Sequence, residues 1–238
     1  MSGIVLVLAS IIDETAASFA TEFVSDPAAS LVTCAGLASA PLELRHPDFG
    51  ASTISVRGDT ISVTRLAGVV NLLPAVFPDE LVCYDEAERE YQAAEFHALL
   101  TFFLSSLTCP VINRATATSL TGPFLNPLGW RPLARSLGLA VASIDLRSDA
   151  FANPLVVPAG RESLEVECLD GRVICPSGTV ADAHTIALAR RGGVEYLRAV
   201  YLPQADGGVQ LLTAHTTPDV KSPVTRAAIF DYFAARRR

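Results

Sequence analysis

Residues 109–139 read CPVINRATATSLTGPFLNPLGWRPLARSLGL. The apolar start of this stretch predicts a buried strand over Cys109–Asn113. After a polar loop, Asn126 begins a helical pattern that ends at Gly138. A further strand is expected over Ala140–Leu146. Strand, helix and strand in this order are typical of a parallel β-sheet.

The chain before this stretch continues the same alternation. Helices are expected over Glu14–Val24, where Asp13 can cap the first turn, and over Tyr84–Leu107. Buried strands are predicted by three apolar runs, Ile4–Ala9, Leu31–Cys34 and Val69–Leu73. A hairpin is expected where Arg57-Gly58-Asp59 separates Thr53–Val56 from Thr60–Val63. We therefore expect residues 1–150 to form a mostly parallel sheet with helices on both faces.

Beyond residue 150 the pattern changes to hairpins and shorter helices. The predicted hairpin strands are Leu164–Cys168 with Arg172–Cys175, and Tyr196–Leu202 with Val209–Thr213. The predicted helices are Val180–Arg191 and Val224–Arg236. This order predicts a small α+β unit over residues 151–238, with an antiparallel sheet and helices on one face. The fold class expected for the whole chain is therefore α/β.

Composition excludes several classes of protein. The net charge of −7 argues against nucleic acid as a partner, because phosphate binding needs clustered Lys and Arg. No apolar run is long enough to span a bilayer, so no membrane role is expected. The five cysteines include no close CxxC pair, which favours reduced thiols in the cytoplasm. Among the 18 Lys and Arg residues only Lys221 is a lysine, so a mechanism needing several lysines is excluded.

Two passages resemble the ATP-grasp ligases. The first is residues 109–139, in which a strand ending in Asn precedes a loop and a helix closing in SLGL, as at the end of the amino-terminal pre-ATP-grasp domain. The second is Val194–Tyr232, which has an Asp-Gly hairpin and then TAHTTPDV at residues 213–220 before a last helix. This order resembles the carboxy-terminal end of the catalytic domain. The resemblance implies enzymes that clamp ATP between two sheets and activate a carboxylate as an acyl phosphate.

The chain departs from the family at the positions that hold Mg²⁺. In register with Asp206-Gly207, the family's acidic ligand falls on Val200, its Glu on Thr213 and its Asn on His215. Valine cannot bind magnesium, and His is a poor ligand for so hard a cation. The glycine-rich lid and its two ATP-binding lysines have no counterpart before Leu164. We therefore expect neither a metal site nor a bound cofactor.

Some polar residues remain as candidates for ligand or partner binding. Asn113 and Arg114 end a predicted parallel strand, where open α/β sheets bind ligands, and Gly122 and Asn126 could line the same cleft. Arg114 could hold a carboxylate or phosphate in bidentate fashion. The alternative interpretation is a packed loop with a surface arginine.

A second group of candidates follows the last predicted hairpin. It contains His215, Thr217, Asp219 and Lys221. A His–Asp pair beside a hydroxyl could support acid–base chemistry. The alternative is a turn whose polar groups satisfy backbone atoms. No residue is assigned a catalytic role.

These observations predict a degenerate ATP-grasp-like protein, a pseudoenzyme that does not act as an autonomous ligase. Its expected partner is an intact ligase or another enzyme of peptide or amino-acid biosynthesis, to which it would present a substrate. A homodimer and a peptide or amino-acid ligand are compatible with this hypothesis. Two alternatives remain open: an autonomous enzyme with a repurposed site around Arg114 and His215, and a small-molecule binding module in the amino-terminal cleft.

Overall fold

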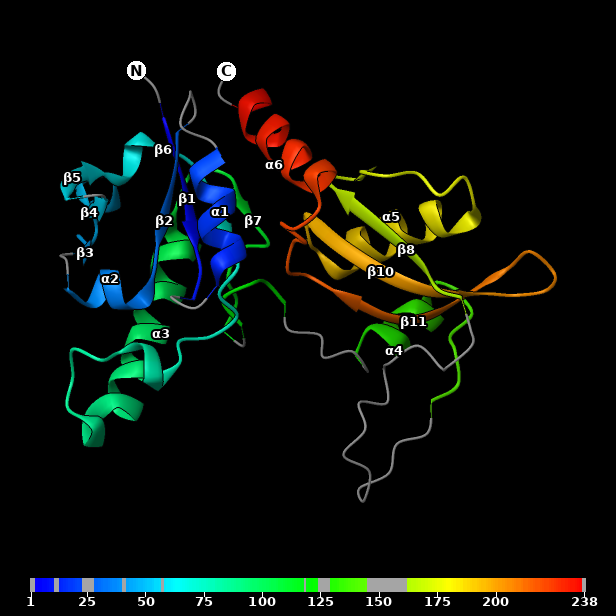
Figure 1. Ribbon diagram of the computed structural model, residues 1–238, viewed down its shortest axis with the longest axis horizontal. Coiled ribbons are helices and arrows are strands. Elements are labelled where there is room, and N and C mark those ends of the chain that lie inside the picture. The colour runs from blue at the N-terminus through cyan, green and yellow to red at the C-terminus, as the bar shows by residue number, and fades with distance from the viewer. Residues whose placement is uncertain are drawn as a thin grey trace. The chain divides into compact units, whose positions relative to one another are not determined.

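A four-stranded parallel sheet forms the centre of the amino-terminal part of the chain (Figure 1). The computed structural model describes residues 3–10, 13–22, 28–39, 42–56, 58–117, 119–123, 129–144 and 162–236. The strand order is β2 (Ala28–Val32), β1 (Ile4–Leu8), β6 (Leu66–Asn71) and β7 (Val111–Ile112). All three pairings are parallel. The sheet predicted from the alternation of strands and helices is confirmed.

Helices cover both faces of this sheet. The long helix α3 (Arg89–Ser106) buries Leu100 and Phe103 against the face that carries Leu6. On the other face, α1 (Glu14–Glu22) and α6 (Pro223–Ala235) meet through Phe19 and Phe230, whose ring centroids are 5.6 Å apart. The two-sided cover is the arrangement expected of a parallel sheet.

Gly68 on β6 is required by the packing of α6. A Cβ atom at Gly68 would clash with the ring of Phe233, which is fully buried. Gly68 pairs with Val5 of β1, so Phe233 packs on the face of the sheet opposite to the α3 cluster. This contact ties the last helix to the amino-terminal sheet.

Smaller elements complete this part of the chain. A three-stranded antiparallel sheet contains β3 (Leu42–Glu43), β4 (Thr53–Val56) and β5 (Asp59–Ser62), which confirms the first predicted hairpin. The helix α2 (Cys34–Ser39) begins where the sequence predicts the end of a strand, because Thr33 Oγ1 accepts a hydrogen bond from Gly36 N at 3.1 Å. Single 3₁₀ turns are η1 (Phe49–Ala51), η2 (Val63–Arg65), η3 (Pro78–Glu80) and η4 (Glu86–Glu88).

A second, antiparallel sheet has the strand order β11 (Val209–His215), β10 (Tyr196–Pro203), β8 (Leu164–Leu169) and β9 (Arg172–Val173) (Figure 1). The helices α4 (Trp130–Ser136) and α5 (Val180–Gly192) share a buried cluster with one face of this sheet. Thr179 caps the start of α5, and Gly193 ends it in the left-handed conformation. The predicted α+β unit is confirmed in its sheet and hairpins.

The described contacts divide the chain into two compact units. Unit 1 contains residues 1–123 and 219–238, and unit 2 contains residues 124–218. The helix α6 therefore belongs to unit 1, whereas the sequence places it with the small antiparallel sheet. The sequence also places Ala140–Leu146 in a strand of the first unit, but Val141 forms only a single bridge, to Leu211 of β11 in unit 2. The domain boundary predicted between residues 150 and 151 lies outside the described residues and stays a prediction.

Within the described ranges, no helix combines the length and apolar character that a membrane span requires.

Candidate functional site

The carboxyl edge of the parallel sheet in unit 1 carries two buried asparagines. Asn71 ends β6, and Asn113 follows β7 directly; both are 1 % exposed. The side-chain amide of Asn71 donates to the carbonyl of Leu120 at 2.6 Å, and its oxygen accepts from the amide of Leu73 at 3.0 Å. The side chain of Asn71 therefore links the end of β6 to the loop after β7 through a hydrogen bond. Asn71 is not among the candidate residues predicted from the sequence, although an amide at the end of an apolar strand is a signal for such a contact.

The loop after Asn113 folds back closely on the strand end. Asn113 has a φ of 52°, and Gly122 has a φ of 96°. A Cβ atom at Gly122 would lie 3.0 Å from Cβ of Asn113, so glycine is required by both the backbone and the close approach. The hydroxyl of Thr116 donates to the carbonyl of Gly122 at 3.2 Å. The structure thus brings Asn113 and Gly122 together, whereas the predicted Asn126 lies outside the described residues.

Arg114 is engaged with the end of α3. Its guanidinium donates to the carbonyls of Leu104 at 2.8 Å, Leu107 at 2.7 Å and Cys109 at 3.0 Å. Carbonyls at the end of a helix have no partner within the helix, so a guanidinium placed there acts as its cap. These hydrogen bonds favour the structural interpretation of Arg114 over the interpretation as a ligand-binding group.

One face of the antiparallel sheet in unit 2 carries polar side chains beside a small buried apolar cluster that includes Val200. Arg198 on β10 lies opposite His215 on β11, and Val200 lies opposite Thr213. Because side chains alternate along a strand, these four residues share one face, which is opposite to the face that packs on α4 and α5. Thr213 is 3 % exposed, and its hydroxyl has no hydrogen-bond partner within the part of the chain that the structure describes.

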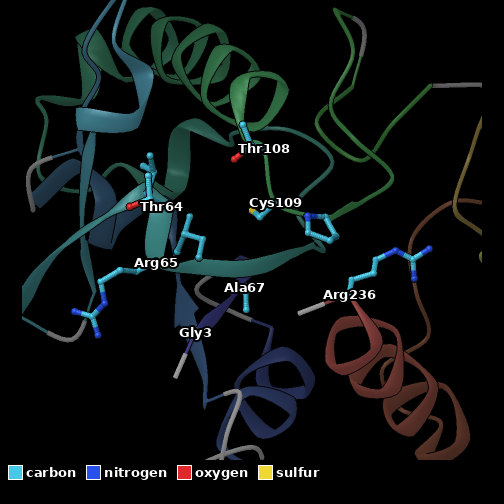
Figure 2. A pocket seen from close by; sticks show the side chains of 10 residues that line it. Gly3, Thr64, Arg65, Ala67, Thr108, Cys109 and Arg236 are labelled. Atoms are coloured by element: carbon cyan, nitrogen blue, oxygen red, sulfur yellow. The ribbon is translucent and has the colours of Figure 1, made fainter. Parts of the chain in front are cut away.

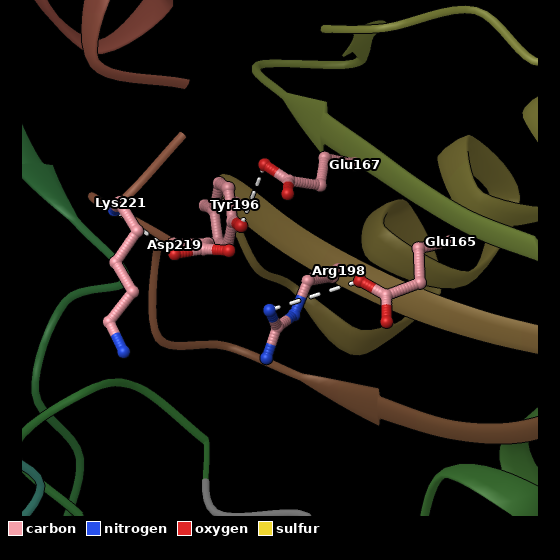
Figure 3. Close-up of polar contacts among 6 residues, drawn as sticks. All are labelled: Glu165, Glu167, Tyr196, Arg198, Asp219 and Lys221. Carbon is pink, nitrogen blue, oxygen red and sulfur yellow. Dashed lines mark hydrogen bonds and ion pairs between the residues drawn. The ribbon is translucent and has the colours of Figure 1, made fainter. Parts of the chain in front are cut away.

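The neighbouring strand β8 adds two carboxylates to this face. Glu165 Oε2 lies 3.9 Å from a guanidinium nitrogen of Arg198 (Figure 3). The hydroxyl of Tyr196 donates to Glu167 Oε2 at 3.0 Å, as Figure 3 also shows. We call the six residues Glu165, Glu167, Tyr196, Arg198, Thr213 and His215 the sheet-face cluster. The side chain of Glu165 is 54 % exposed, so its ion pair with Arg198 contributes little to stability.

His215 is held in its neutral form. Burial lowers the pKa of its imidazole below the ordinary value of 6.5, and the charge of Arg198 lowers it further. Glu165 partly opposes this shift. At neutral pH the imidazole therefore offers one N–H donor and one nitrogen acceptor beside the guanidinium.

The three positions at which the resemblance implies metal ligands do not fit Mg²⁺. The resemblance implies metal ligands at the positions of Val200, Thr213 and His215. The pairing of β10 with β11 confirms only that these three positions share one face of the sheet. Their side chains offer no carboxylate, and Arg198 adds a positive charge beside them. No group of three or more His, Cys, Asp or Glu side chains suited to a metal ion occurs among the described residues. Arg198 and His215 offer hydrogen-bond donors, which suit carbonyl and carboxylate groups better than hard cations.

The remaining predicted residues form the entry to α6. Asp219 Oδ1 accepts from the amide of Lys221 at 3.0 Å (Figure 3). Ser222 caps α6 by accepting from the amide of Thr225. This is a turn that satisfies backbone atoms, as in the structural interpretation. His215 and Thr217 belong to unit 2, whereas Asp219 and Lys221 belong to unit 1. The four residues are therefore divided between the two compact units.

The fold is similar to that of several solved ATP-grasp ligases. The ATP-grasp ligase PsnB, complexed with a phosphomimetic variant of minimal precursor, Mg and ADP, has a TM-score of 0.72 at 15 % identity, and the match covers 100 % of this chain and 98 % of that chain. The macrocyclase MdnC from Microcystis aeruginosa MRC, bound with precursor peptide MdnA, has a TM-score of 0.69 at 10 % identity over 96 % and 98 % of the two chains. A RiPP-associated ATP-grasp ligase from Chryseobacterium gregarium, in complex with ADP and a leader and core peptide, has a TM-score of 0.64 at 9 % identity over 99 % and 98 %. No protein-family model and no curated protein matches the sequence. This chain therefore has the fold of the ATP-grasp ligases over its whole length.

Proposed function

We propose that this protein is a non-autonomous, ATP-grasp-like subunit that binds a peptide for a biosynthetic ligase and does not itself hold Mg-ATP. The observation that carries the proposal is the pairing of Val200 with Thr213 on the face that also bears His215. These are the three positions at which the resemblance implies metal ligands. None of these three side chains supplies a carboxylate through which a divalent cation could bridge the phosphates of ATP.

The positive charge of Arg198 on this face supports the same proposal. A metal site of this kind gathers carboxylates, whereas here Arg198 lies opposite His215. Glu165 Oε2 lies 3.9 Å from a guanidinium nitrogen of Arg198. A divalent cation on this face would therefore meet a guanidinium that competes for the same carboxylate. The single lysine of the chain, Lys221, lies in the turn before α6 and not in a phosphate-binding lid.

A peptide is the ligand class that the sheet-face cluster fits. Its guanidinium and imidazole groups recognise carbonyl and carboxylate oxygens, which peptides offer along their backbones and on Asp and Glu side chains. Several solved structures of the same fold are described as complexes with precursor peptides. We infer that the retained fold serves to bind a peptide, and that an intact ligase supplies the nucleotide chemistry.

Nucleotide titration by calorimetry tests the first half of the proposal. The full chain is titrated with ATP in the presence and absence of Mg²⁺, and an intact ATP-grasp ligase serves as the positive control. We expect no magnesium-dependent heat from this chain at concentrations that saturate the control. Magnesium-dependent binding of ATP in the micromolar range by the isolated chain would falsify the proposal.

Co-purification tests the second half. A tagged chain is expressed with a candidate ligase and its peptide, and Arg198→Ala and Thr213→Val are compared with the wild type. We expect the wild type to retain the peptide and the ligase, and Arg198→Ala to lose the peptide. Arg172→Ala is the matched control, because Arg172 is an exposed arginine on β9 in the same sheet. Equal peptide retention by all variants contradicts a role of the sheet-face cluster.

One observation favours a second candidate function. The pKa of His215 is lowered by burial, so its imidazole is neutral at physiological pH and can accept a proton. A repurposed active site around His215 would use it as a general base without ATP. Turnover of an amide or ester substrate by the chain alone, abolished by His215→Gln, would support this alternative. Because Arg114 caps α3, the repurposed site would not include it.

A further inference from the structure

The solvent-exposed side of α3 carries a line of apolar residues. Tyr91 is 66 % exposed, and Phe102 is 42 % exposed although its ring packs edge-on against that of Phe49. Ala94 and Ala98 lie between them in the helix and are also exposed. Because Tyr91, Ala94, Ala98 and Phe102 are spaced three or four positions apart, they form one continuous line, which we call the α3 strip. Apolar faces of helices are ordinarily buried, so the α3 strip is suited to a partner.

The shape of the α3 strip fits another helix. At the rise of an α-helix the strip is about 16 Å long, which is three turns. The small side chains of Ala94 and Ala98 in its middle allow a second helix to approach to the usual axial distance of about 8–10 Å. Tyr91 and Phe102 offer larger apolar contacts at the two ends. The strip therefore favours a helical partner segment over an extended one.

The negative charge of the chain is concentrated where α3 begins. Residues 79–95 contain seven Asp and Glu residues and one basic residue, Arg89, and so account for six of the seven net negative charges. The Nε atom of Arg89 donates to the carbonyl of Tyr84 at 3.1 Å. Glu88 and Glu95 are exposed and seven residues apart, which places both along one flank of the α3 strip. The surface beside the strip therefore favours a positively charged partner.

The turn η3, which packs on α3, independently points to a cationic partner. Glu80 in this turn is 6 % exposed, and its buried Oε2 atom accepts no hydrogen bond from the described residues. A buried acceptor of this kind is unfavourable until a donor reaches it. Phe77 and Val82, on either side of η3, are exposed. An unsatisfied carboxylate oxygen and exposed apolar side chains thus occur in the same segment.

We propose that the α3 strip and the acidic residues beside it form a docking surface for a basic, amphipathic helix of a partner protein. The apolar side of that helix packs on the α3 strip, and its Lys or Arg side chains pair with Glu88 and Glu95. The surface lies in unit 1 and uses none of the residues of the sheet-face cluster. The proposal is therefore independent of peptide binding by unit 2.

The sign of the charge distinguishes this partner from other occupants. A second copy of the chain brings a further six net negative charges to the interface, and these repel those of the first. Nucleic acids and anionic lipid surfaces also carry negative charge. A basic segment is the occupant whose charge complements residues 79–95.

A pocket of about 540 Å³ at the amino ends of β1 and β6 does not compete for such a partner (Figure 2). Its charged lining residues are Arg65 and Arg236, whose side chains are directed away from Ala67 at its floor, as Figure 2 shows. No carboxylate of the described residues lines it. Two arginines repel a basic segment, which leaves the acidic start of α3 as the complementary surface.

The experiment uses the full chain and three labelled synthetic peptides, each of 18 residues. The first is an amphipathic helix with Leu on one side and Lys on its flanks. The second has Glu in place of Lys, and the third has the composition of the first without an apolar side. Fluorescence anisotropy should show the first binding at least about tenfold more tightly than the others, and more weakly as salt is raised.

Charge variants test the acidic flank. Glu88→Gln/Glu95→Gln should weaken the basic peptide at least about fivefold. Glu14→Gln/Asp231→Asn is the matched control, because it removes two exposed carboxylates from α1 and α6, which cover the other face of the parallel sheet. The control should bind the peptide as the wild type does.

A blocking variant tests the α3 strip itself. Ala98→Lys places a long, positively charged side chain in the middle of the strip and should weaken the basic peptide at least about tenfold. Ala234→Lys, at an exposed position of α6, is its control and should leave the affinity unchanged. Equal binding of the Lys and Glu peptides, or an affinity that both test variants retain, would overturn the proposal. So would sedimentation of the chain alone as a dimer that Ala98→Lys dissociates.

Discussion

Val200 on β10 lies directly opposite Thr213 on β11, and both side chains point to the sheet face that also carries His215. An apolar side chain and a hydroxyl group thus occupy neighbouring positions at which the resemblance implies carboxylates. Thr213 is nearly fully buried and lacks a hydrogen-bond partner among the described residues, so its hydroxyl is an energetic cost at this position.

Restoring carboxylates at these positions should create a metal site. The variant Val200→Asp/Thr213→Glu/His215→Asn is expected to bind Mn²⁺, measured by electron paramagnetic resonance, because two carboxylates and an amide oxygen form a hard donor set. The wild type should not bind it. The control variant Val200→Asn/Thr213→Gln/His215→Asn has the same shape without the charges. If the acidic variant folds but binds no more Mn²⁺ than this control, the family's ligand positions do not correspond to Val200, Thr213 and His215.

Arg114→Ala should lower the free energy of unfolding by about 2 kcal/mol, because three carbonyls near the end of α3 lose a charged donor. Chemical denaturation measures this change. Arg172→Ala is the control, and as an exposed site it should change the free energy by less than about 0.5 kcal/mol. A loss no larger than that of Arg172→Ala would show that the guanidinium does not stabilise the helix end.

Gly122→Ala and Gly178→Ala form a matched pair. Both glycines have positive φ angles, 96° and 70°, but only a Cβ at Gly122 meets another atom closely, Cβ of Asn113 at 3.0 Å. We expect about 1 kcal/mol of destabilisation for Gly178→Ala, from the left-handed backbone alone. Gly122→Ala should cost at least about 1 kcal/mol more, because the loop must move away from Asn113. Equal melting temperatures for the two variants would contradict the close approach.

Stability should depend on the protonation of His215. The folded pKa of His215 is lowered by burial, so the unfolded chain binds more protons than the folded chain at mildly acidic pH. Above the pKa of 6.5 that His215 has in the unfolded chain, its protonation does not lower the free energy of unfolding. As the pH falls from 6.5 toward the lower pKa of the folded state, protonation of His215 increasingly destabilises the fold. His215→Gln should reduce the loss of stability between pH 7.5 and pH 5.5, measured by urea denaturation.

A second variant checks the cause of that shift. Glu165→Gln removes the carboxylate that favours the charged imidazole, so the pKa of His215 should fall further. Titration by NMR follows the imidazole directly. A rise of the pKa in Glu165→Gln would contradict the electrostatic account. His184 also has its pKa lowered by burial and remains in both variants, so the residual pH dependence is expected to include it.

Much of the fold follows from local sequence signals. The hairpin of β10 and β11 is set by Asp206-Gly207, and α5 by Thr179 at its start and Gly193 at its end. These signals act between residues that are close in sequence, which is why they can be read without knowledge of the packing. The position of α6 is different. Its contacts with Gly68 and Phe19 join residues far apart in the chain, so the sequence predicts the helix but not the sheet on which it packs.

The same distinction applies to the candidate residues. The sequence predicts that a strand ends at Asn113, and β7 does end directly before this residue. This prediction succeeds because the apolar run before Asn113 is a local pattern. The guanidinium of Arg114 reaches the carbonyl of Leu104 because of the path that the chain takes from α3 to β7. This path cannot be read from the periodicity of apolar residues. The role of Asn71 depends likewise on Leu120, 49 residues away in the chain.

The contacts of α6 with the amino-terminal sheet have a consequence for synthesis of the protein. Because unit 1 is interrupted by residues 124–218, its parallel sheet emerges from the ribosome long before the helix that covers Gly68 and contacts Phe19. Unit 2, which is continuous in sequence, is complete before α6 is translated. The part of the sheet's apolar face that α6 covers, beside α1, therefore stays exposed while the second unit is made, and a chain stopped after residue 218 would leave that part exposed.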